Sequence, residues 1–150
     1  MTNANILAQM MEGDSLEVAM SEVGVDSARN MEVKRFAQRM VTTHTQHMDE
    51  VKSTASKAKV TPERAAGDTA TAMMAKRMMD RLSDTKPSAA RDRLLMESEV
   101  YFHTQLLHDI ESARADATGP TKQLVEDTEP VVKHHLADAR AILRKLGTAS

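Results

Sequence analysis

Cysteine and tryptophan are absent from this 150-residue chain, which has only one Tyr, two Phe, five Gly and four Pro. The absence of Cys excludes disulfides, thiolate metal sites and cysteine nucleophiles. The shortage of aromatic side chains removes the stacking platforms that bind single-stranded nucleic acid. A balance of 20 basic and 22 acidic residues leaves no strongly basic surface for a duplex. We therefore expect no nucleic-acid partner.

Long hydrophobic runs are also missing. No stretch approaches the roughly 20 apolar residues that a helix needs to span a bilayer, so we expect no membrane-spanning segment. The first residues, M-T-N-A-N-I, lack the basic and apolar regions of a secretory signal peptide. On this evidence the chain is either cytoplasmic or a mature form with an added initiator Met.

The residues that are abundant favour helices. Ala, Leu, Glu, Lys, Arg and 12 Met are frequent, while strand formers are few, which predicts an all-α fold. A length of 150 residues suits a single domain over 1–150 with its own core. Because aromatic side chains are so few, Met, Leu, Val and Ala must fill that core.

Apolar residues recur at steps of three and four in four long segments, which is the period of an amphipathic helix. We predict helices over residues 5–27, 30–59, 88–117 and 120–146. Asn30 is a suitable N-cap and Gly147 a suitable stop signal, and Pro130 is expected to kink the last helix. Helices of this number and length predict an antiparallel four-helix bundle.

Residues 60–87 follow a different pattern. A short amphipathic segment over 69–82 carries four Met, and residues 83–87 have the composition of a loop. The stretch is too long for a tight turn, which predicts one long crossover containing a short extra helix, as in ferritin-like bundles. The Met sulfurs could bind Cu(I). We favour the simpler interpretation that they cover the open side of the bundle with adaptable apolar side chains.

Polar residues interrupt the apolar stripes near the middle of each long helix. They are Glu17, His44, Glu99, His103 and His135. A polar side chain on a buried stripe is costly unless a partner satisfies it, and helical bundles build metal sites from such residues. The helix midpoints lie within about two residues, or roughly 3 Å of helical rise, of four of these side chains. We therefore predict that they meet at one level inside the bundle, with Asp14 and Glu22 off the inward stripe.

Two interpretations of this polar layer stay open. Imidazoles with one or two carboxylates suit a single transition-metal ion such as Zn, Cu, Fe or Mn, with Glu99 as a ligand or a proton acceptor. Alternatively, the residues hydrogen-bond to one another and fix the register of the bundle without a metal. A di-iron ferroxidase centre is not expected, because the inward faces lack its two Glu-x-x-His pairs. A haem held by Met10 and His135 is disfavoured, because few aromatic residues are there to line its pocket.

One segment carries a family resemblance. The sequence from Asn30 to His44, N-M-E-V-K-R-F-A-Q-R-M-V-T-T-H, resembles the signature N-P-E-V-K-x-F-A-Q-x-M-V-x-D-H of a bacterial envelope family catalogued as domain-of-unknown-function family 4142. G-D-S-L-E-V from Gly13, D-R…V-Y-F-H from Asp92 and P-V-V-K-H-H-L from Pro130 are similar to its other motifs. The resemblance therefore covers nearly the whole chain.

The resemblance implies a ferritin-like fold and an envelope or periplasmic location. It also implies that the family's recurring polar positions are, in this chain, Glu17, His44, His103 and His135. Thr43 departs from the pattern because the family has an acidic residue there, which could orient the neighbouring imidazole. The family does not itself supply an activity.

Together these observations predict a small envelope protein that binds one transition-metal ion for sequestration or stress protection. The competing interpretation is a structural or protein-interaction module, and a metal-dependent oxidase is a third. No Gly-rich phosphate loop or nucleophile elbow is found, which argues against an enzyme of those classes. The expected partners are the metal ion and, for assembly, a second copy of the chain in a homodimer.

Overall fold

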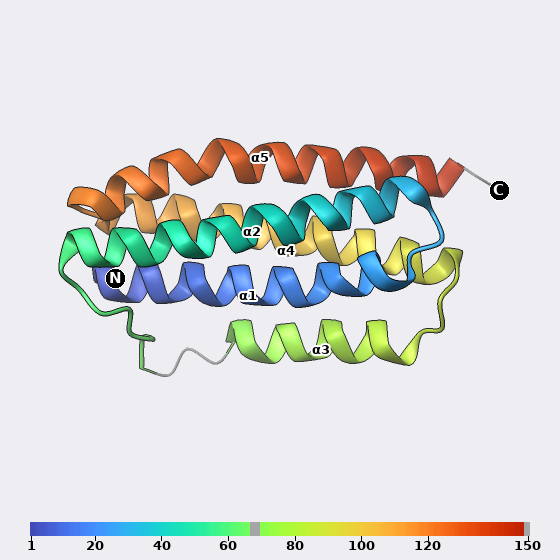
Figure 1. Ribbon diagram of the computed structural model, residues 1–150, viewed down its shortest axis with the longest axis horizontal. Coiled ribbons are helices and arrows are strands. Elements are labelled where there is room, and N and C mark those ends of the chain that lie inside the picture. The colour runs from blue at the N-terminus through green and yellow to red at the C-terminus, as the bar shows by residue number, and fades with distance from the viewer. Residues whose placement is uncertain (67–69, 149–150) are drawn as a thin grey trace.

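Four long helices and one short helix make up the part of the chain that the computed structural model describes, residues 1–66 and 70–148. The helices are α1 (Asn3–Ser27), α2 (Met31–Ala58), α3 (Ala70–Asp84), α4 (Ala89–Asp116) and α5 (Gly119–Thr148). The long helices form an antiparallel bundle, and α3 lies in the crossover from α2 to α4 (Figure 1). This crossover returns the chain along the bundle, so that α2 and α4 run parallel, which is the connectivity of ferritin-like folds. The predicted fold class is confirmed.

The observed boundaries of α1, α2 and α4 lie within two residues of those predicted. Local capping explains the agreement for α2, because the Asn30 side chain accepts hydrogen bonds from the backbone N–H groups of Glu32 (2.8 Å) and Val33 (3.3 Å). Lys59 then ends α2 in the left-handed conformation, with φ 56°. Thr69, the first residue of the predicted crossover helix, lies outside the described residues.

The predicted role of Gly147 as a stop signal is wrong. It was expected to end α5 after Leu146, but the helix includes Gly147 and ends at Thr148, two residues beyond the predicted end. Gly147 packs close to the first turn of α4, where an added Cβ would lie 3.1 Å from the Arg93 guanidinium. The glycine therefore allows a close contact instead of serving as a cap. α5 also continues through Pro130 as one helix and is arched along its length (Figure 1).

An acidic residue in α4 fixes the turn between α1 and α2. The carboxylate of Asp92 is 3% exposed and accepts hydrogen bonds from the backbone N–H groups of Arg29 (3.0 Å) and Asn30 (2.6 Å). Because these are charge-assisted bonds to groups that the turn itself leaves unpaired, Asp92 holds the α1–α2 hairpin on α4.

The apolar core is divided into two clusters along the length of the bundle. Leu7, Val51, Ile110 and Val125 represent the cluster that contains the start of α1 and the end of α2. The cluster at the other end of the bundle contains Met20, Phe36, Met40, Leu95 and Met96. The five buried residues of the predicted polar layer lie between the two clusters. This arrangement satisfies the composition-based expectation that Met and aliphatic residues supply most of the core.

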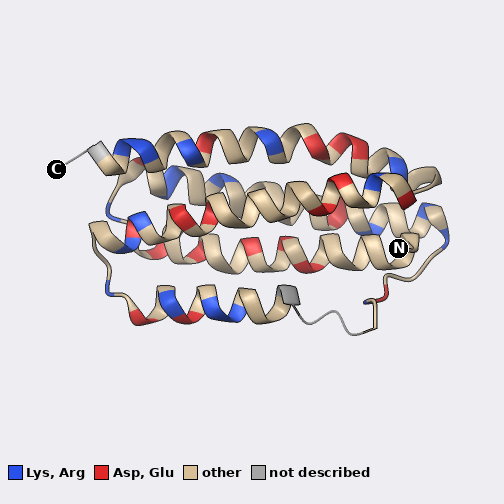
Figure 2. Ribbon diagram, turned by 180° about the vertical axis from the view of Figure 1, so that it is seen from behind, with Lys and Arg blue, Asp and Glu red and all other residues tan. Residues whose placement is uncertain are grey.

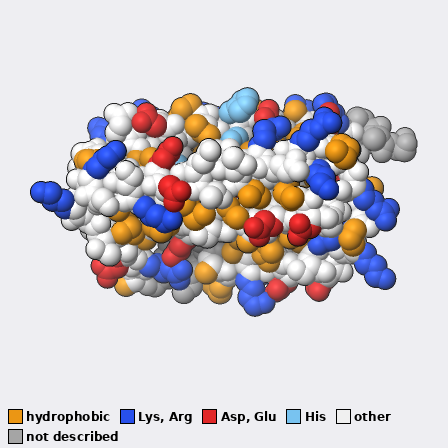
Figure 3. Space-filling model, in the orientation of Figure 1, with side chains coloured by type: hydrophobic (Ala, Val, Ile, Leu, Met, Phe, Trp, Pro, Cys, Tyr) orange, Lys and Arg blue, Asp and Glu red, His pale blue; other side chains and the backbone are white. Residues whose placement is uncertain are grey.

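The short helix α3 covers one side of the bundle and contacts α1 and α4. Met78 and Leu82 of α3 are buried and belong to the second apolar cluster, whereas Met73 is 55% exposed. Part of the Met-rich segment thus does fill the core. Lys, Arg, Asp and Glu are interspersed along the outer faces of all five helices (Figure 2), as they are on the face shown in Figure 3. Within the described residues, no helix combines the length and apolarity that crossing a bilayer requires.

Candidate metal centre

All five residues predicted to form the polar layer are buried at the middle of the bundle. Their exposed fractions are 0% for Glu17, 4% for His44, 0% for Glu99, 0% for His103 and 8% for His135. They come from all four long helices. α4 supplies two of them, at positions i and i+4 on one face of the helix, and each of the other three helices supplies one. The structure therefore brings together every residue that the sequence placed in this layer.

Three imidazoles form a triangle at the centre. The ring centroids of His44 and His103 are 5.8 Å apart, those of His44 and His135 are 5.8 Å apart, and those of His103 and His135 are 5.5 Å apart. One ring nitrogen from each residue lies within 4.8 Å of the other two. A metal bound to imidazole at about 2.0–2.1 Å would need each nitrogen to move by less than about 1 Å.

Hydrogen bonds on the outer side of two rings determine which nitrogen faces the centre. Nδ1 of His44 donates to Oδ1 of Asp14 at 2.7 Å, and Nδ1 of His103 donates to the backbone carbonyl of Glu99 at 2.9 Å. In the neutral form of each ring the Nε2 atom then has a free lone pair, and both Nε2 atoms are buried without a hydrogen-bond partner in the described structure. Nδ1 of His135 is buried and unpartnered in the same way.

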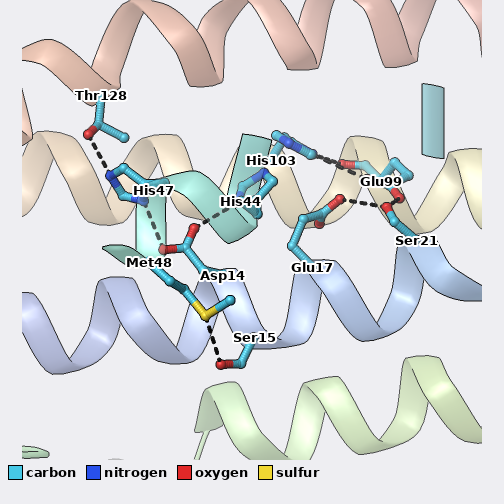
Figure 4. Close-up of polar contacts among 10 residues, drawn as sticks. All are labelled: Asp14, Ser15, Glu17, Ser21, His44, His47, Met48, Glu99, His103 and Thr128. Atoms are coloured by element: carbon cyan, nitrogen blue, oxygen red, sulfur yellow. Dashed lines mark hydrogen bonds and ion pairs between the residues drawn. The ribbon is translucent and has the colours of Figure 1, made fainter. Parts of the chain in front are cut away.

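Two carboxylates lie against the same layer. The hydroxyl of Ser21 is 3.2 Å from Oε1 of Glu17 and 3.1 Å from Oε1 of Glu99, so the two side chains meet at this serine (Figure 4). Oε2 of each carboxylate is buried without a hydrogen-bond partner among the described residues, although Oε2 of Glu99 lies 3.5 Å from Nδ1 of His103. Glu17, Glu99 and His103 also offer ligand atoms within 4.8 Å of one another. The acidic pair therefore adjoins the imidazole triangle through His103.

Burial favours the neutral form of one of these carboxylates. It raises the pKa of Glu99 well above its usual range, and the charge of Glu17 and a hydrogen bond with it raise the pKa further. The structure thus favours a proton on Glu99.

The pKa values of the three imidazoles are shifted in different directions by their surroundings. Burial lowers the pKa of His103, although the nearby charge of Glu17 acts in the opposite direction. Burial, together with the neighbouring imidazoles, lowers the pKa of His135 to about 3. For His44, burial is outweighed by the Asp14 hydrogen bond and the charges of Glu17 and Asp14, which raise the pKa. His103 and His135 are consequently neutral at neutral pH, the form that a metal binds.

Sequence reasoning missed Asp14, which was expected off the inward stripe. Asp14 is 3% exposed, and its carboxylate accepts from His44 and, at 2.8 Å, from Nδ1 of His47. Nε2 of His47 lies 2.9 Å from the Thr128 hydroxyl of α5 (Figure 4). Asp14 thus supplies, from α1, the orienting carboxylate that the sequence lacks at Thr43. The signal for it was the three-residue step to Glu17.

The family assignment rests on most of the chain. The sequence profile of the family described as Domain of unknown function (DUF4142) matches residues 1–142. The chain belongs to this family. The resemblance inferred from the helix motifs is therefore confirmed. No protein with a curated description matches the chain.

Two solved structures have the same fold at low sequence identity. A DUF305 fragment from Deinococcus radiodurans has a TM-score of 0.82 at 12% identity, covering 95% of each chain. A DUF305 protein from Streptomyces coelicolor has a TM-score of 0.79 at 14% identity, covering 97% of this chain and 94% of the other. At these identities the comparison establishes a shared bundle architecture and nothing about ligands.

Proposed function

We propose that this protein binds one transition-metal ion at the centre of the bundle through His44, His103 and His135, with Glu17, which lies next to His103, as a fourth ligand. The observation that carries the proposal is the imidazole triangle. Each of its three rings, from α2, α4 and α5, has a buried nitrogen without a hydrogen-bond partner in the described structure, and the three residues offer ligand atoms within 4.8 Å of one another. Buried polar atoms are nearly always paired, so three converging nitrogens without partners favour a bound cation.

The outward hydrogen bonds support the same conclusion. Metal-binding His residues usually donate their other N–H to a carboxylate or a carbonyl, as His44 does to Asp14 and His103 does to the Glu99 backbone. A layer built only to fix the register of the bundle would instead pair imidazole with imidazole or with carboxylate on the inner side. Glu99 holds a proton beside Glu17 and limits the negative charge at the site.

The donor set defines the class of metal. Neutral imidazoles and one carboxylate suit Zn²⁺, Cu²⁺, Fe²⁺ or Mn²⁺, and tetrahedral coordination by three His and one Glu is most natural for Zn²⁺. The proposed role is sequestration or protection from metal stress in the bacterial envelope. The location is supported by the family resemblance and by the description of one DUF305 relative as a "putative secreted protein". A homodimer stays a prediction.

The test is metal stoichiometry combined with thermal unfolding. Protein stripped with chelator and reloaded separately with Zn²⁺, Cu²⁺, Fe²⁺ and Mn²⁺ should hold one ion per chain by elemental analysis. At 100-fold excess over Kd, binding should stabilise the fold by about 2.7 kcal/mol, or roughly 5–10 °C in Tm. His103→Ala should abolish the increase in Tm on metal addition. If the alanine variant does not fold, His103→Gln is the replacement for the same test.

The matched control is His134→Ala. His134 is adjacent to His135 in sequence, but its side chain is 74% exposed and points away from the centre. This variant should keep the stoichiometry and the Tm gain of the wild type. An absence of bound metal and of any Tm shift with all four ions would instead support the structural or protein-interaction module.

A further inference from the structure

A cavity of about 150 Å³ between α2 and α5 connects the proposed centre with the surface. His44, His135 and Asp14 line its inner part, and each is less than 9% exposed. Glu50 and Asp127 line its outer part and are exposed. The volume corresponds to about five water molecules at roughly 30 Å³ each, so a partly hydrated ion fits.

Acidic side chains line this passage, together with His44, His47 and His135. Its lining includes the carboxylates of Asp14, Glu50 and Asp127, and contains no Lys or Arg among the described residues. A narrow opening lined by carboxylates raises the local concentration of cations and excludes anions. A second, larger groove lies beside α3. Its lining contains both a basic residue, Arg77, and an acidic residue, Asp109, and so it is not lined by acidic charges alone.

A third imidazole stands part-way along the passage. His47 is 15% exposed, less accessible than Glu50 and Asp127 at the surface but more accessible than His44. Its ring is held between Asp14 and Thr128, so its orientation is fixed and the side chain lines the passage without blocking it.

We propose that the passage between α2 and α5 is the uptake route of the metal ion, with Glu50 and Asp127 as the attracting charges and His47 as the first imidazole that the ion meets. This inference rests on the proposed function, because it assigns a path to the same centre. No bond is made or broken beyond ligand exchange: water leaves the ion as imidazole nitrogen and carboxylate oxygen replace it. The route predicts effects on the rate of loading and not on the final stoichiometry.

The test is stopped-flow loading of the chelator-stripped protein with Zn²⁺, followed by competition with a colorimetric zinc indicator. Glu50→Gln combined with Asp127→Asn should lower the association rate constant at least threefold at low salt and flatten its dependence on ionic strength. The matched control is Glu22→Gln combined with Asp26→Asn. It removes the same two charges from exposed positions on α1 and should load at the wild-type rate.

A steric variant tests the path itself. Val131 is 42% exposed and lines the opening, so Val131→Trp should slow loading at least tenfold, whereas Val131→Ala should not slow it. After long incubation all these variants should reach one Zn²⁺ per chain. Wild-type loading rates in both the charge-removed and the Trp variants would overturn the passage while leaving the centre intact. Failure of the wild type to take up Zn²⁺, Cu²⁺, Fe²⁺ and Mn²⁺ alike would overturn the centre and the passage together.

Discussion

Oδ1 of Asp14 lies 2.7 Å from Nδ1 of His44, across the interface between α1 and α2. The same carboxylate holds His47 with its other oxygen at 2.8 Å, so one buried acid orients two imidazoles on α2. A carboxylate that accepts from a ligand imidazole fixes the ring orientation and makes its inner nitrogen a better donor. Asp14 is therefore the residue on which the geometry of the proposed centre most depends without itself touching the ion.

Replacing this carboxylate should weaken metal binding without removing it. We expect Asp14→Asn to reduce the affinity for Zn²⁺ about 10–100-fold, the range typical for loss of such an orienting partner. The measurement is competition with a chelator of known affinity. Asp26→Asn, an exposed change on the same helix, is the control and should bind like the wild type. Equal affinity in both variants would show that Asp14 orients nothing relevant to the ion.

The lowered pKa of His135 should appear as an acid sensitivity of the metal-free protein. The unfolded chain binds a proton near pH 6.5, whereas the folded protein does so only near pH 3. Between these values the unfolded state holds more protons, so stability falls as the pH falls, by up to about 1.4 kcal/mol per pH unit. We expect His135→Leu to remove this part of the slope, measured by urea unfolding from pH 7 to pH 4. An unchanged slope would contradict the burial of a neutral imidazole.

Glu99 should contribute to the pH dependence of stability with the opposite sign to His135. Its pKa is raised in the folded state, so above pH 4.5 the folded protein holds a proton that the unfolded chain has lost. Stability from this group is therefore present below pH 4.5 and is lost as the pH rises through the folded-state value. Glu99→Gln keeps a neutral side chain of the same shape and should unfold at higher urea concentration than the wild type at pH 8, but not at pH 4. The exposed Glu97→Gln should show no such difference.

Two glycines of α1 should respond in opposite ways to alanine. A Cβ at Gly24 would lie 2.6 Å from Cδ2 of Leu95 and 2.8 Å from Cβ of Ala37, so Gly24→Ala should destabilise the fold by about 1–3 kcal/mol. A Cβ at Gly13 would meet no atom closer than 3.8 Å. Gly13→Ala should therefore stabilise the fold by about 0.5–1 kcal/mol through helix propensity. The measurement is the Tm of each variant by thermal unfolding. Gly24→Ala should have a lower Tm than the wild type, and Gly13→Ala a higher one.

The sequence was sufficient for the bundle and for the five central residues, because both depend on helical periodicity. His44, His103 and His135 interrupt apolar stripes in the middles of long helices, and the axial alignment of four similar helices brings such positions together. The capping residue Asn30 likewise has a local signal. These features depend on residues three or four positions apart in the chain.

The partners of these residues could not be predicted in the same way. Asp14 seemed to lie off the stripe, but α1 contacts all four other helices, so its buried arc is wider than one apolar stripe. The contact of His47 with Thr128 depends on the exact rotation of α2 against α5, and the contact of Asp92 with Arg29 depends on a turn from another hairpin. Such contacts are set by tertiary packing and leave no mark in local periodicity.

The division of the core by a polar layer has a consequence for how the molecule opens. The two apolar clusters consist of different buried residues, although the partly buried Leu106 packs against both, so we expect each end of the bundle to lose its packing partly independently of the other. A metal ion coordinated by residues from all four long helices at the middle of the bundle would couple the two halves, so that they unfold as one cooperative unit. Slowed amide hydrogen exchange at both ends upon metal addition, far from any ligand atom, would be the signature of that linkage.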